Sequence, residues 1–450
     1  MAKIIKIRQG LNIPLQGSAQ RIKRHYDDSE HYTIYPDDYS GLSPKVAVKA
    51  GDSVKAGSPV MYDKNYPELK IVSPVSGSVL AVNRGEKRKL MSIEITADTT
   101  QQSLNFDLKK AVNLKAVLAE SGLLALFKQR PYDRIVNPAD TPRDIFVSAF
   151  DTAPLAPDLH YIINEDIADF EMGLTILSKL TANKVYVGLS ADNQQQYQTP
   201  DNVVYYTFKG VHPAGNVGVQ INHIQAINKG ETVWTVAPQD VLTIGRTYRS
   251  GKVDLTRWVA LTGSEVKADD LAYYALLPGA DLSKLFAKTI SNQHETKRYI
   301  SGNVLTGTQI TATGSLHAFD SQITVIPEGS ETHELLGWAM PRFGQFSVSR
   351  SYPAAWLFNR IKKYSIDARI KGGKRAMIMS NEWDKVFPMD ILPEFLIRAI
   401  LAQDIDKMEE LGIYEVAPED FALCEFVDTS KMELQKIVRE GLDMLYKEMN

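Results

Sequence analysis

The segment Phe127–Ile135 interleaves two aromatic side chains with three basic ones, a combination that can face a planar or an anionic ligand. Such side chains could contact a quinone head group, an anionic cofactor or an acidic patch on a partner protein. A solvated basic segment with Phe127 packed into the core explains the same pattern equally well. The residues that form the pattern are Phe127, Lys128, Arg130, Tyr132 and Arg134.

The loop over 210–218 is the second candidate, because it carries three glycines, a proline and a histidine after a predicted strand. A glycine-rich loop in that place lets backbone amides approach a phosphate group. However, the loop has neither the Gly-x-Gly-x-x-Gly spacing nor a Gly-x-x-x-x-Gly-Lys-Ser/Thr motif. We therefore favour a loop in which Pro213 and Gly215 set the shape of the chain. His212 is then either a site residue or a hydrogen-bonded loop histidine.

Residues 46–79 have the turn pattern of a biotinyl or lipoyl carrier domain, with Gly-Asp at 51–52 and Ser-Pro-x-x-Gly-x-Val at 73–79. In true carriers a lysine at an exposed hairpin tip is acylated, and Lys64 is the counterpart here. The spacing from Lys64 to Ser73 is too long for the carrier hairpin, and no domain for acyl transfer is visible. The pattern therefore predicts the carrier fold, with Lys64 as an unmodified surface lysine.

Several classes of site are excluded by residue counts and spacing. The eight histidines form no His-x-x-x-His or His-Glu-x-x-His pair, and no Gly-x-Ser-x-Gly elbow is present. Cys424 is the single cysteine, so a disulfide within the chain, an all-cysteine zinc site and a thiolate-ligated cluster are impossible. Its apolar neighbours predict a packed thiol. We expect no catalytic residue, no bound cofactor and no metal site in this chain.

Composition narrows the class of protein further. The 450 residues include 51 Lys and Arg and 54 Asp and Glu, a net charge of −3 that argues against nucleic-acid binding. Residues 1–10 alternate basic and isoleucine side chains, which predicts an opening strand and not a signal peptide. No run of about 18 apolar residues occurs, so we expect no transmembrane helix. A chain of this length suggests roughly three domains.

Hydrophobic periodicity divides the chain into four ranges. Short strands and turns over 1–103 predict a small β-sandwich or barrel. Alternating strands and helices over 104–252 predict an α/β domain with a largely parallel sheet. Range 253–330 suggests a β-grasp-like α+β unit, and 331–450 an irregular segment followed by helices. The predicted strands beyond the first range are 145–149, 184–189, 203–208, 232–236, 257–262, 299–300, 304–305 and 323–326. The predicted helices are 165–180, 239–248, 281–290, 393–403, 404–411 and 431–449.

Five motifs in this order resemble the A subunit of the sodium-translocating NADH:quinone oxidoreductase. Each is weak alone, but together they are specific and cover essentially the whole chain. They are Gly10–Gly17, Arg130–Tyr132, Ile145–Leu155, His212–Gly215 and Asp420–Phe426.

The resemblance implies a peripheral subunit on the cytoplasmic face of the bacterial inner membrane, without a transmembrane span. In that family six subunits pass electrons from NADH through flavins and iron–sulfur centres to a quinone such as ubiquinone and export Na+. NADH, flavins, clusters and Na+ are handled by the other subunits, which are the partners. The implied domains are a carrier-like barrel-sandwich hybrid (1–103), a Rossmann-like domain (104–252), a β-grasp domain of the soluble-ligand-binding type (253–330) and a helical C-terminal domain (331–450).

The family is associated with quinone binding, which the resemblance places beside Phe127, Arg130, Pro131, Tyr132, Asp133 and Arg134. Two departures from the family pattern remove other roles. Gln220 and Asn222 replace two histidines, so a metal or proton-relay role there is not essential. Asp428 replaces a second cysteine, which removes any two-thiol redox site.

Three other interpretations remain open at this point. A relative of the C subunit of the Rnf-type ferredoxin:NAD oxidoreductase, or a flavin-bearing NADH-oxidising subunit, would share the same modules. Those proteins need repeated Cys-x-x-Cys motifs or a glycine-rich flavin loop, and this sequence has neither. A stand-alone lipoyl-type carrier or adaptor is the second, and a scaffold that binds no small molecule is the third.

Overall fold

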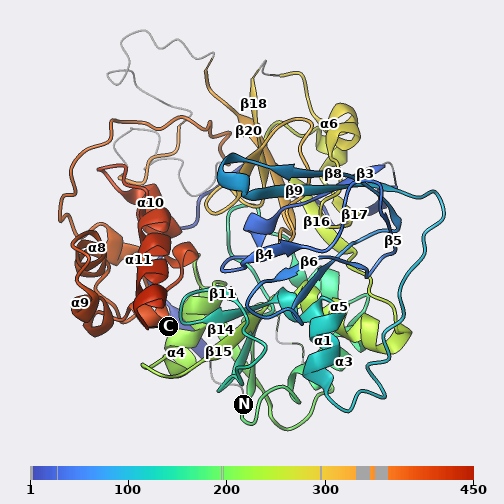
Figure 1. Ribbon diagram of the computed structural model, residues 1–450. Coiled ribbons are helices and arrows are strands. Elements are labelled where there is room, and N and C mark those ends of the chain that lie inside the picture. The colour runs from blue at the N-terminus through green and yellow to red at the C-terminus, as the bar shows by residue number, and fades with distance from the viewer. Residues whose placement is uncertain are drawn as a thin grey trace.

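Four β-sheets and a group of C-terminal helices make up the described part of the chain. This computed structural model describes residues 4–27, 29–193, 195, 197–293, 296–330, 345–349 and 363–449. Figure 1 shows helices α8, α9, α10 and α11 together at the left, while the blue strands β3 to β9 lie on the other side of the molecule.

Two small sheets with a shared core form the N-terminal β layers. Ile93 and Ile95 alternate along β9 and are fully buried, whereas the adjacent Val60 and Met61 are both buried where an irregularity interrupts the pairing of β6 with β7. The predicted short strands are confirmed here. One sheet has the order β3 (His31–Ile34), β9 (Leu90–Ala97), β8 (Gly77–Arg84), β5 (Ser53–Val54), and the other has the order β4 (Pro44–Val46), β6 (Pro59–Asp63), β7 (Lys70–Val72).

The first strands of the chain belong to the two larger sheets. β1 (Ile4–Ile7) confirms the predicted opening strand and pairs in parallel with β14 (Val203–Gly210). β2 (Lys23–His25) pairs in parallel with β17 (Tyr273–Leu276). Sequence order could not show this, because an edge strand takes its partner from a distant part of the chain.

A seven-stranded sheet forms the centre of the molecule, and its parallel part confirms the predicted α/β unit. β1, β14, β13, β12 and β15 run parallel, and β10 and β11 are antiparallel at one edge. Ile145 and Val147 face the main core, whereas Phe146 packs with Ile221 on the opposite face. Both faces of the sheet are therefore apolar and need helical cover. The strands not yet bounded are β10 (Phe127–Arg130), β11 (Arg134–Ile135), β12 (Ile145–Ser148), β13 (Val185–Ser190) and β15 (Val233–Val236).

Helices cover both faces of this sheet. α3 (Ile167–Leu177) and α5 (Pro238–Ser250) cross at close range, because Gly173 and Gly245 lie at their contact. A Cβ on Gly245 would lie 1.8 Å from the carbonyl oxygen of Asp169. α4 (Val217–Gln225) covers the opposite face, beside β12. The shorter helices near this unit are α1 (Leu114–Glu120) and α2 (Leu159–Ile163).

A six-stranded mixed sheet packs beside the N-terminal β layers, and the strand predicted over 304–305 is wrong. The side chain of Asn303 accepts hydrogen bonds from the backbone amides of Leu305 (2.8 Å) and Thr306 (3.0 Å), which closes a turn. These amides cannot join a strand ladder. The sheet has the order β19 (Thr308–Ile310), β18 (Lys297–Ser301), β20 (Gln322–Pro327), β16 (Arg257–Thr262), β17, β2, and its helix is α6 (Ser283–Thr289).

The predicted C-terminal helices are confirmed, while residues 331–344 and 350–362 of the predicted irregular segment lie outside the described residues. α11 (Leu434–Met449) buries Leu434, Val438, Leu442 and Leu445, a helical stripe that packs on the other helices. The remaining helices are α8 (Pro393–Leu401), α9 (Ile405–Glu410) and α10 (Ala422–Val427).

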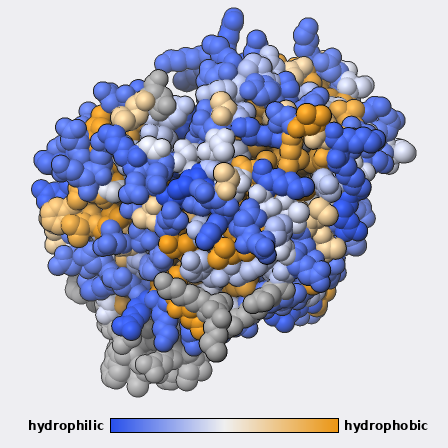
Figure 2. Space-filling model, turned by 90° about the horizontal axis from the view of Figure 1, so that it is seen from below, coloured by the Kyte–Doolittle hydropathy of each residue, from blue (hydrophilic) through white to orange (hydrophobic). Residues whose placement is uncertain are grey.

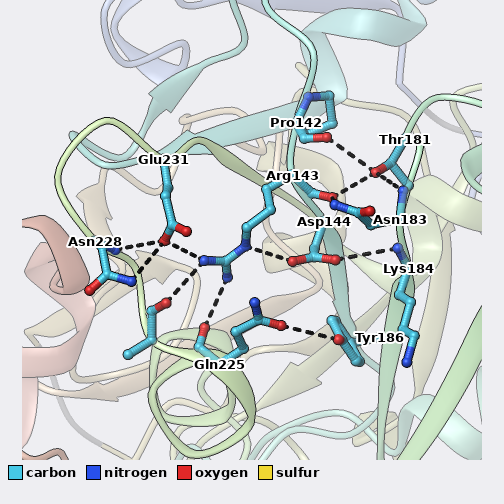
Figure 3. A network of polar contacts seen from close by, with 11 residues as sticks. Pro142, Arg143, Asp144, Thr181, Asn183, Lys184, Tyr186, Gln225, Asn228 and Glu231 are labelled. Carbon is cyan, nitrogen blue, oxygen red and sulfur yellow. Dashed lines mark hydrogen bonds and ion pairs between the residues drawn. The ribbon is translucent and has the colours of Figure 1, made fainter.

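A polar network fixes the amino ends of the central strands, away from the carboxyl ends that meet the candidate site. Figure 3 shows Arg143 at its centre, just before β12. The guanidinium donates to Asp144 (2.7 Å), to the Glu231 carboxylate, and to the carbonyl oxygen of Gln225 (3.1 Å). The Thr181 hydroxyl donates to the carbonyl oxygen of Arg143 (2.9 Å). The Arg143 side chain therefore connects the segment before β12 to the segment before β15.

We expect Arg143→Met to lower the free energy of unfolding by about 2 kcal/mol, since Asp144 would keep a buried charge without its cation. Urea unfolding followed by circular dichroism measures the change. Arg8→Met is the matched control, because Arg8 is exposed on the surface and its loss should change stability by less than about 0.5 kcal/mol. Equal effects of the two substitutions would contradict a structural role for the network.

Candidate functional site

A cavity of about 290 Å3 lies at the carboxyl edge of the seven-stranded sheet. The chain leaves β12 toward β13 on one side and returns in β15 on the other, so the strand order reverses between β12 and β15. In open α/β sheets, ligands bind in the crevice at such a reversal. Turns of the six-stranded sheet at 302–306 and 319–322, together with Glu419 from the C-terminal region, close the opposite wall.

The cavity brings together the two candidates that the sequence singled out. Lys128, Arg130 and Asp133 from the first candidate line it, and so do His212 and Gly215 from the second. The two segments are about 80 residues apart in the sequence and meet because β10, which runs antiparallel to β15, begins at the edge where β14 ends. Their convergence, which the sequence could not show, makes this cavity the candidate site.

Phe127 is not a cavity residue. It is fully buried and packs edge to face on Trp234, with ring centroids 5.7 Å apart. Arg130 is also buried, with 1% of its side chain exposed. The interpretation of a solvated basic segment is therefore wrong for Arg130, although its packed Phe127 is confirmed.

The turn over 131–133 separates this cavity from a second one of about 750 Å3, which Pro131, Tyr132 and Arg134 line. The Tyr132 ring meets Tyr446 of α11 edge to face at 5.2 Å. The Arg134 guanidinium stacks on the same Tyr446 ring at 3.7 Å from its centroid. The six predicted quinone-proximal residues thus divide among the core and two cavities.

The turn is held in an unfavourable backbone conformation by the C-terminal helix. Tyr132 and Asp133 have φ values of 80° and 48°, in the left-handed region that bulky residues avoid. Arg439 of α11 donates to the carbonyl oxygens of Tyr132 (2.6 Å) and Asp133 (3.0 Å). Strain of this kind persists only where surrounding contacts enforce it. Arg439 therefore fixes the direction in which Asp133 enters the cavity.

A buried ion pair joins the edge of the sheet to the C-terminal region. The Arg130 guanidinium lies 3.1 Å from Asp420, whose side chain is fully buried, and 3.0 Å from Glu419. It also donates to the carbonyl oxygen of Glu415. Gly218 at the start of α4 leaves the space that the pair needs, since a Cβ there would lie 2.5 Å from the Asp420 carboxylate oxygens.

Glu419 and Asp420 are site residues that sequence reasoning missed as such, although Asp420 begins one of the five motifs. The signal that could have found them is the pair of adjacent carboxylates before the apolar run 421–424. Their partner is 289 and 290 residues away, so nothing local pointed to Arg130.

The charged groups of the cavity differ in protonation. Desolvation and the neighbouring Asp420 carboxylate raise the pKa of Glu419 to about 7, against the attraction of Arg130. Its side chain remains 42% exposed, and it lies in the cavity wall, where surrounding protein displaces much of the bulk water. Burial alone would raise the pKa of Asp133, but Lys128, Arg130 and Arg439 lower it. Asp133 in turn raises the pKa of Lys128. Near neutral pH the cavity therefore holds a charged Lys128, a charged Asp133 and a partly protonated Glu419.

His212 is buried and neutral. Burial lowers the pKa of its imidazole to about 4. Its Nδ1 lies 3.1 Å from the Thr152 hydroxyl, and that hydroxyl accepts a hydrogen bond from the amide of Gly215 (2.9 Å). The loop is therefore fixed by hydrogen bonds to the segment after β12, and also by the Ser148 hydroxyl at the end of β12, which donates to the carbonyl oxygen of Gly215.

The two departures from the family pattern form structural contacts. Gln220 donates to the Ser148 hydroxyl at 2.7 Å, beneath the cavity. Asn222 donates to the Glu415 carboxylate at 2.8 Å and so links α4 to the C-terminal region. Among the described residues, no group of three or more His, Cys, Asp or Glu side chains is arranged to hold a metal ion.

The remaining candidates lie away from the cavity. Lys64 is exposed at the start of the loop between β6 and β7. Cys424 is fully buried in α10, and burial raises the pKa of its thiol, so the predicted packed thiol is confirmed. Within the described residues, every helix is too short or too polar to cross a lipid bilayer.

Comparison with known proteins identifies relatives along the whole chain. Three family models match: the NqrA N-terminal barrel-sandwich hybrid domain over 5–98, the NqrA second alpha/beta domain over 109–253 and the NQRA C-terminal domain over 258–312. The first match confirms the predicted barrel-sandwich hybrid.

Three curated relatives share one name, the A subunit of Na(+)-translocating NADH-quinone reductase. The proteins from Serratia proteamaculans and Neisseria meningitidis are both 35% identical, and the one from Yersinia pestis is 36% identical. Each alignment covers 99% of this chain and 100% of the relative. A solved NAD+-reducing [NiFe]-hydrogenase matches 69% of this chain and 55% of its own at 10% identity, with a TM-score of 0.35, which is too weak to inform function.

We expect Arg130→Met to lower the free energy of unfolding by about 3–5 kcal/mol, because it leaves the Asp420 carboxylate buried without a partner. Chemical denaturation of the full chain measures the loss. The double variant Arg130→Met/Asp420→Asn should recover part of it, since the second change removes the unpaired charge. A double variant as unstable as the sum of its two single variants would contradict the ion pair.

We expect the stability of the wild-type chain, relative to Glu419→Gln, to fall as pH rises from about 4.5 to 7. Because its pKa is raised, Glu419 keeps its proton in the folded state at pH values where the unfolded state has released it. The free energy of unfolding is therefore highest below the pKa of the unfolded state and falls as the pH rises through the pKa of the folded state. The melting temperatures of both proteins from pH 5 to 8 test this. A constant difference across that range would show that Glu419 titrates normally.

Proposed function

The chain belongs to the family of Na+-translocating NADH-quinone reductase A subunits, and from this premise we propose that its cavity binds the head group of a quinone. As part of that enzyme complex it serves NADH oxidation, quinone reduction and Na+ export without a catalytic centre of its own. The proposal includes the finer assignments: a six-subunit complex, a place on the cytoplasmic face of the bacterial inner membrane, and NADH, flavins, iron–sulfur centres and Na+ held by other subunits.

Two fold assignments support this picture. The parallel strands with helices on both faces and a reversed strand order are what a Rossmann-like domain requires. The six-stranded mixed sheet with α6 fits a β-grasp domain. We take the cavity between these two units as the ligand site, because ligand pockets occur preferentially at such interfaces.

The observation that carries the proposal is the convergence of Lys128, Asp133 and Glu419 in one cavity with partly apolar walls. A quinone is a flat ring with two carbonyl acceptors. The Lys128 ammonium lies 5.7 Å from the centroid of the Phe319 ring, so a donor and an aromatic face occur side by side. Near neutral pH the partly protonated Glu419 carboxyl, whose pKa is raised to about 7, can donate a hydrogen bond to a quinone carbonyl.

The surface supports a subunit role. Figure 2 shows apolar side chains gathered at the left edge of the face seen from below, the side on which Figure 1 places α8 and α9. Leu392, Phe395 and Leu401 are exposed in and beside α8. Exposed apolar patches of this kind mark interaction sites, so we assign this surface to another subunit of the complex.

We expect a photoreactive quinone analogue, applied to the complex copurified from native membranes, to label the peptide containing 127–135. Lys128→Met should reduce the labelling and raise the KM for quinone about tenfold, because a hydrogen bond from a charged donor is lost. Mass spectrometry of the labelled peptides and quinone reductase assays are the measurements. Lys64→Met is the matched control, since Lys64 is an exposed lysine that does not line the cavity. Label found on the membrane subunits alone would overturn the proposal.

A further inference from the structure

A larger groove adjoins the candidate cavity at Leu305. The groove has a volume of about 920 Å3 and lies between the turn 303–306, the segment 365–371 and α10. Leu305 is in the lining of both the groove and the cavity. Its carbonyl oxygen accepts a hydrogen bond from Gln435 of α11 (3.0 Å), and its amide is held by Asn303. The boundary between the two spaces is therefore a fixed apolar side chain.

The lining of the groove beyond Leu305 contains several apolar side chains, together with charged ones such as Asp367, Arg369 and Lys431. The Phe426 ring stacks with Phe346, with centroids 6.5 Å apart and planes at 25°. Ile366 and Phe426 pack against the core of the C-terminal helices and remain half-buried. Ile370 is 66% exposed, at the outer end. An apolar chain entering at Leu305 would contact apolar side chains as far as the surface.

A second neighbouring space adjoins the cavity at Phe150 and Leu159. Both spaces carry charged side chains in their walls, so charge does not separate them. The groove differs because large apolar side chains in its lining, Val348 and Ile370, are exposed, whereas the described lining of the second space has none among the exposed large apolar residues. Burial of such side chains by a hydrocarbon is favourable, so of these two spaces the groove beyond Leu305 fits a hydrocarbon better.

We propose that this groove binds the isoprenoid tail of a quinone whose head group occupies the cavity, an inference that rests on the proposed function. The cavity of about 290 Å3 is at the lower limit of small-molecule sites and has room for a substituted ring without a long tail. The tail must leave it, and Leu305 is the apolar side chain shared with the groove. This assignment gives the site a preference for long-tailed quinones and makes Leu305 the residue that separates head from tail.

The test measures binding of benzoquinones with one, two or three isoprenoid units to the full-length chain by equilibrium dialysis. Each added unit that enters the groove should lower the dissociation constant at least about tenfold, because even partial burial removes several apolar carbons from water. Ile370→Asp should abolish the gain from the longer tails and leave the shortest quinone unchanged. The control is Leu80→Asp on β8, since Leu80 is 55% exposed and lies outside both spaces.

Each other outcome identifies what has failed. If the short quinone binds but tail length has no effect, the groove assignment is overturned and the head-group site stands. If no quinone binds, and none labels the copurified complex, the proposed function itself is overturned. If decanoate binds and is lost in Ile370→Asp while tail length has no effect, the groove holds a lipid acyl chain and the quinone assignment is wrong.

Discussion

The buried contact between Arg130 and Asp420 is the interaction on which the candidate site depends. A guanidinium removed from water costs several kcal/mol unless its partners are placed with good geometry. Here the partners come from a region almost 300 residues later in the chain, so the edge of the sheet is complete when the C-terminal region is packed against it. Gly218 is part of the same requirement, because any side chain there would occupy the space of the Asp420 carboxylate.

The same C-terminal region fixes three parts of the cavity wall. Arg439 holds the left-handed turn that carries Asp133, Gln435 holds the turn that carries Leu305, and Glu419 itself lines the wall. Because two of these contacts originate on α11, a displacement of that helix would alter both turns together. The exposed α8 surface, which we assign to a partner subunit, belongs to the same group of helices that holds the cavity wall.

Sequence reasoning succeeded where a pattern is local and long. The sequence predicts the bounds of α11, α5 and the central strands within a few residues, because the spacing of their apolar residues shows which face is buried. It failed at 304–305, where two apolar residues suggested a strand and the side chain of Asn303 formed a turn instead. The partners of β1 and β2 were equally hidden, since pairing across the chain leaves no local signal. The domain boundaries remain a prediction, because the first strands join sheets built mainly from later residues.

The candidate site shows the same division between residue type and placement. Lys128, Arg130 and His212 were found from their chemistry, but their meeting at one sheet edge depends on topology. Two carboxylates share one guanidinium there. Desolvation, and then repulsion by the Asp420 carboxylate, raise the pKa of Glu419 to about 7, so its side chain retains a proton to about neutral pH. Loss of that proton leaves a carboxylate already 3.0 Å from Arg130, so the charge that appears is stabilised where it forms. Arg130 therefore both holds the C-terminal region in place and, by its charge, limits the rise in the pKa of Glu419.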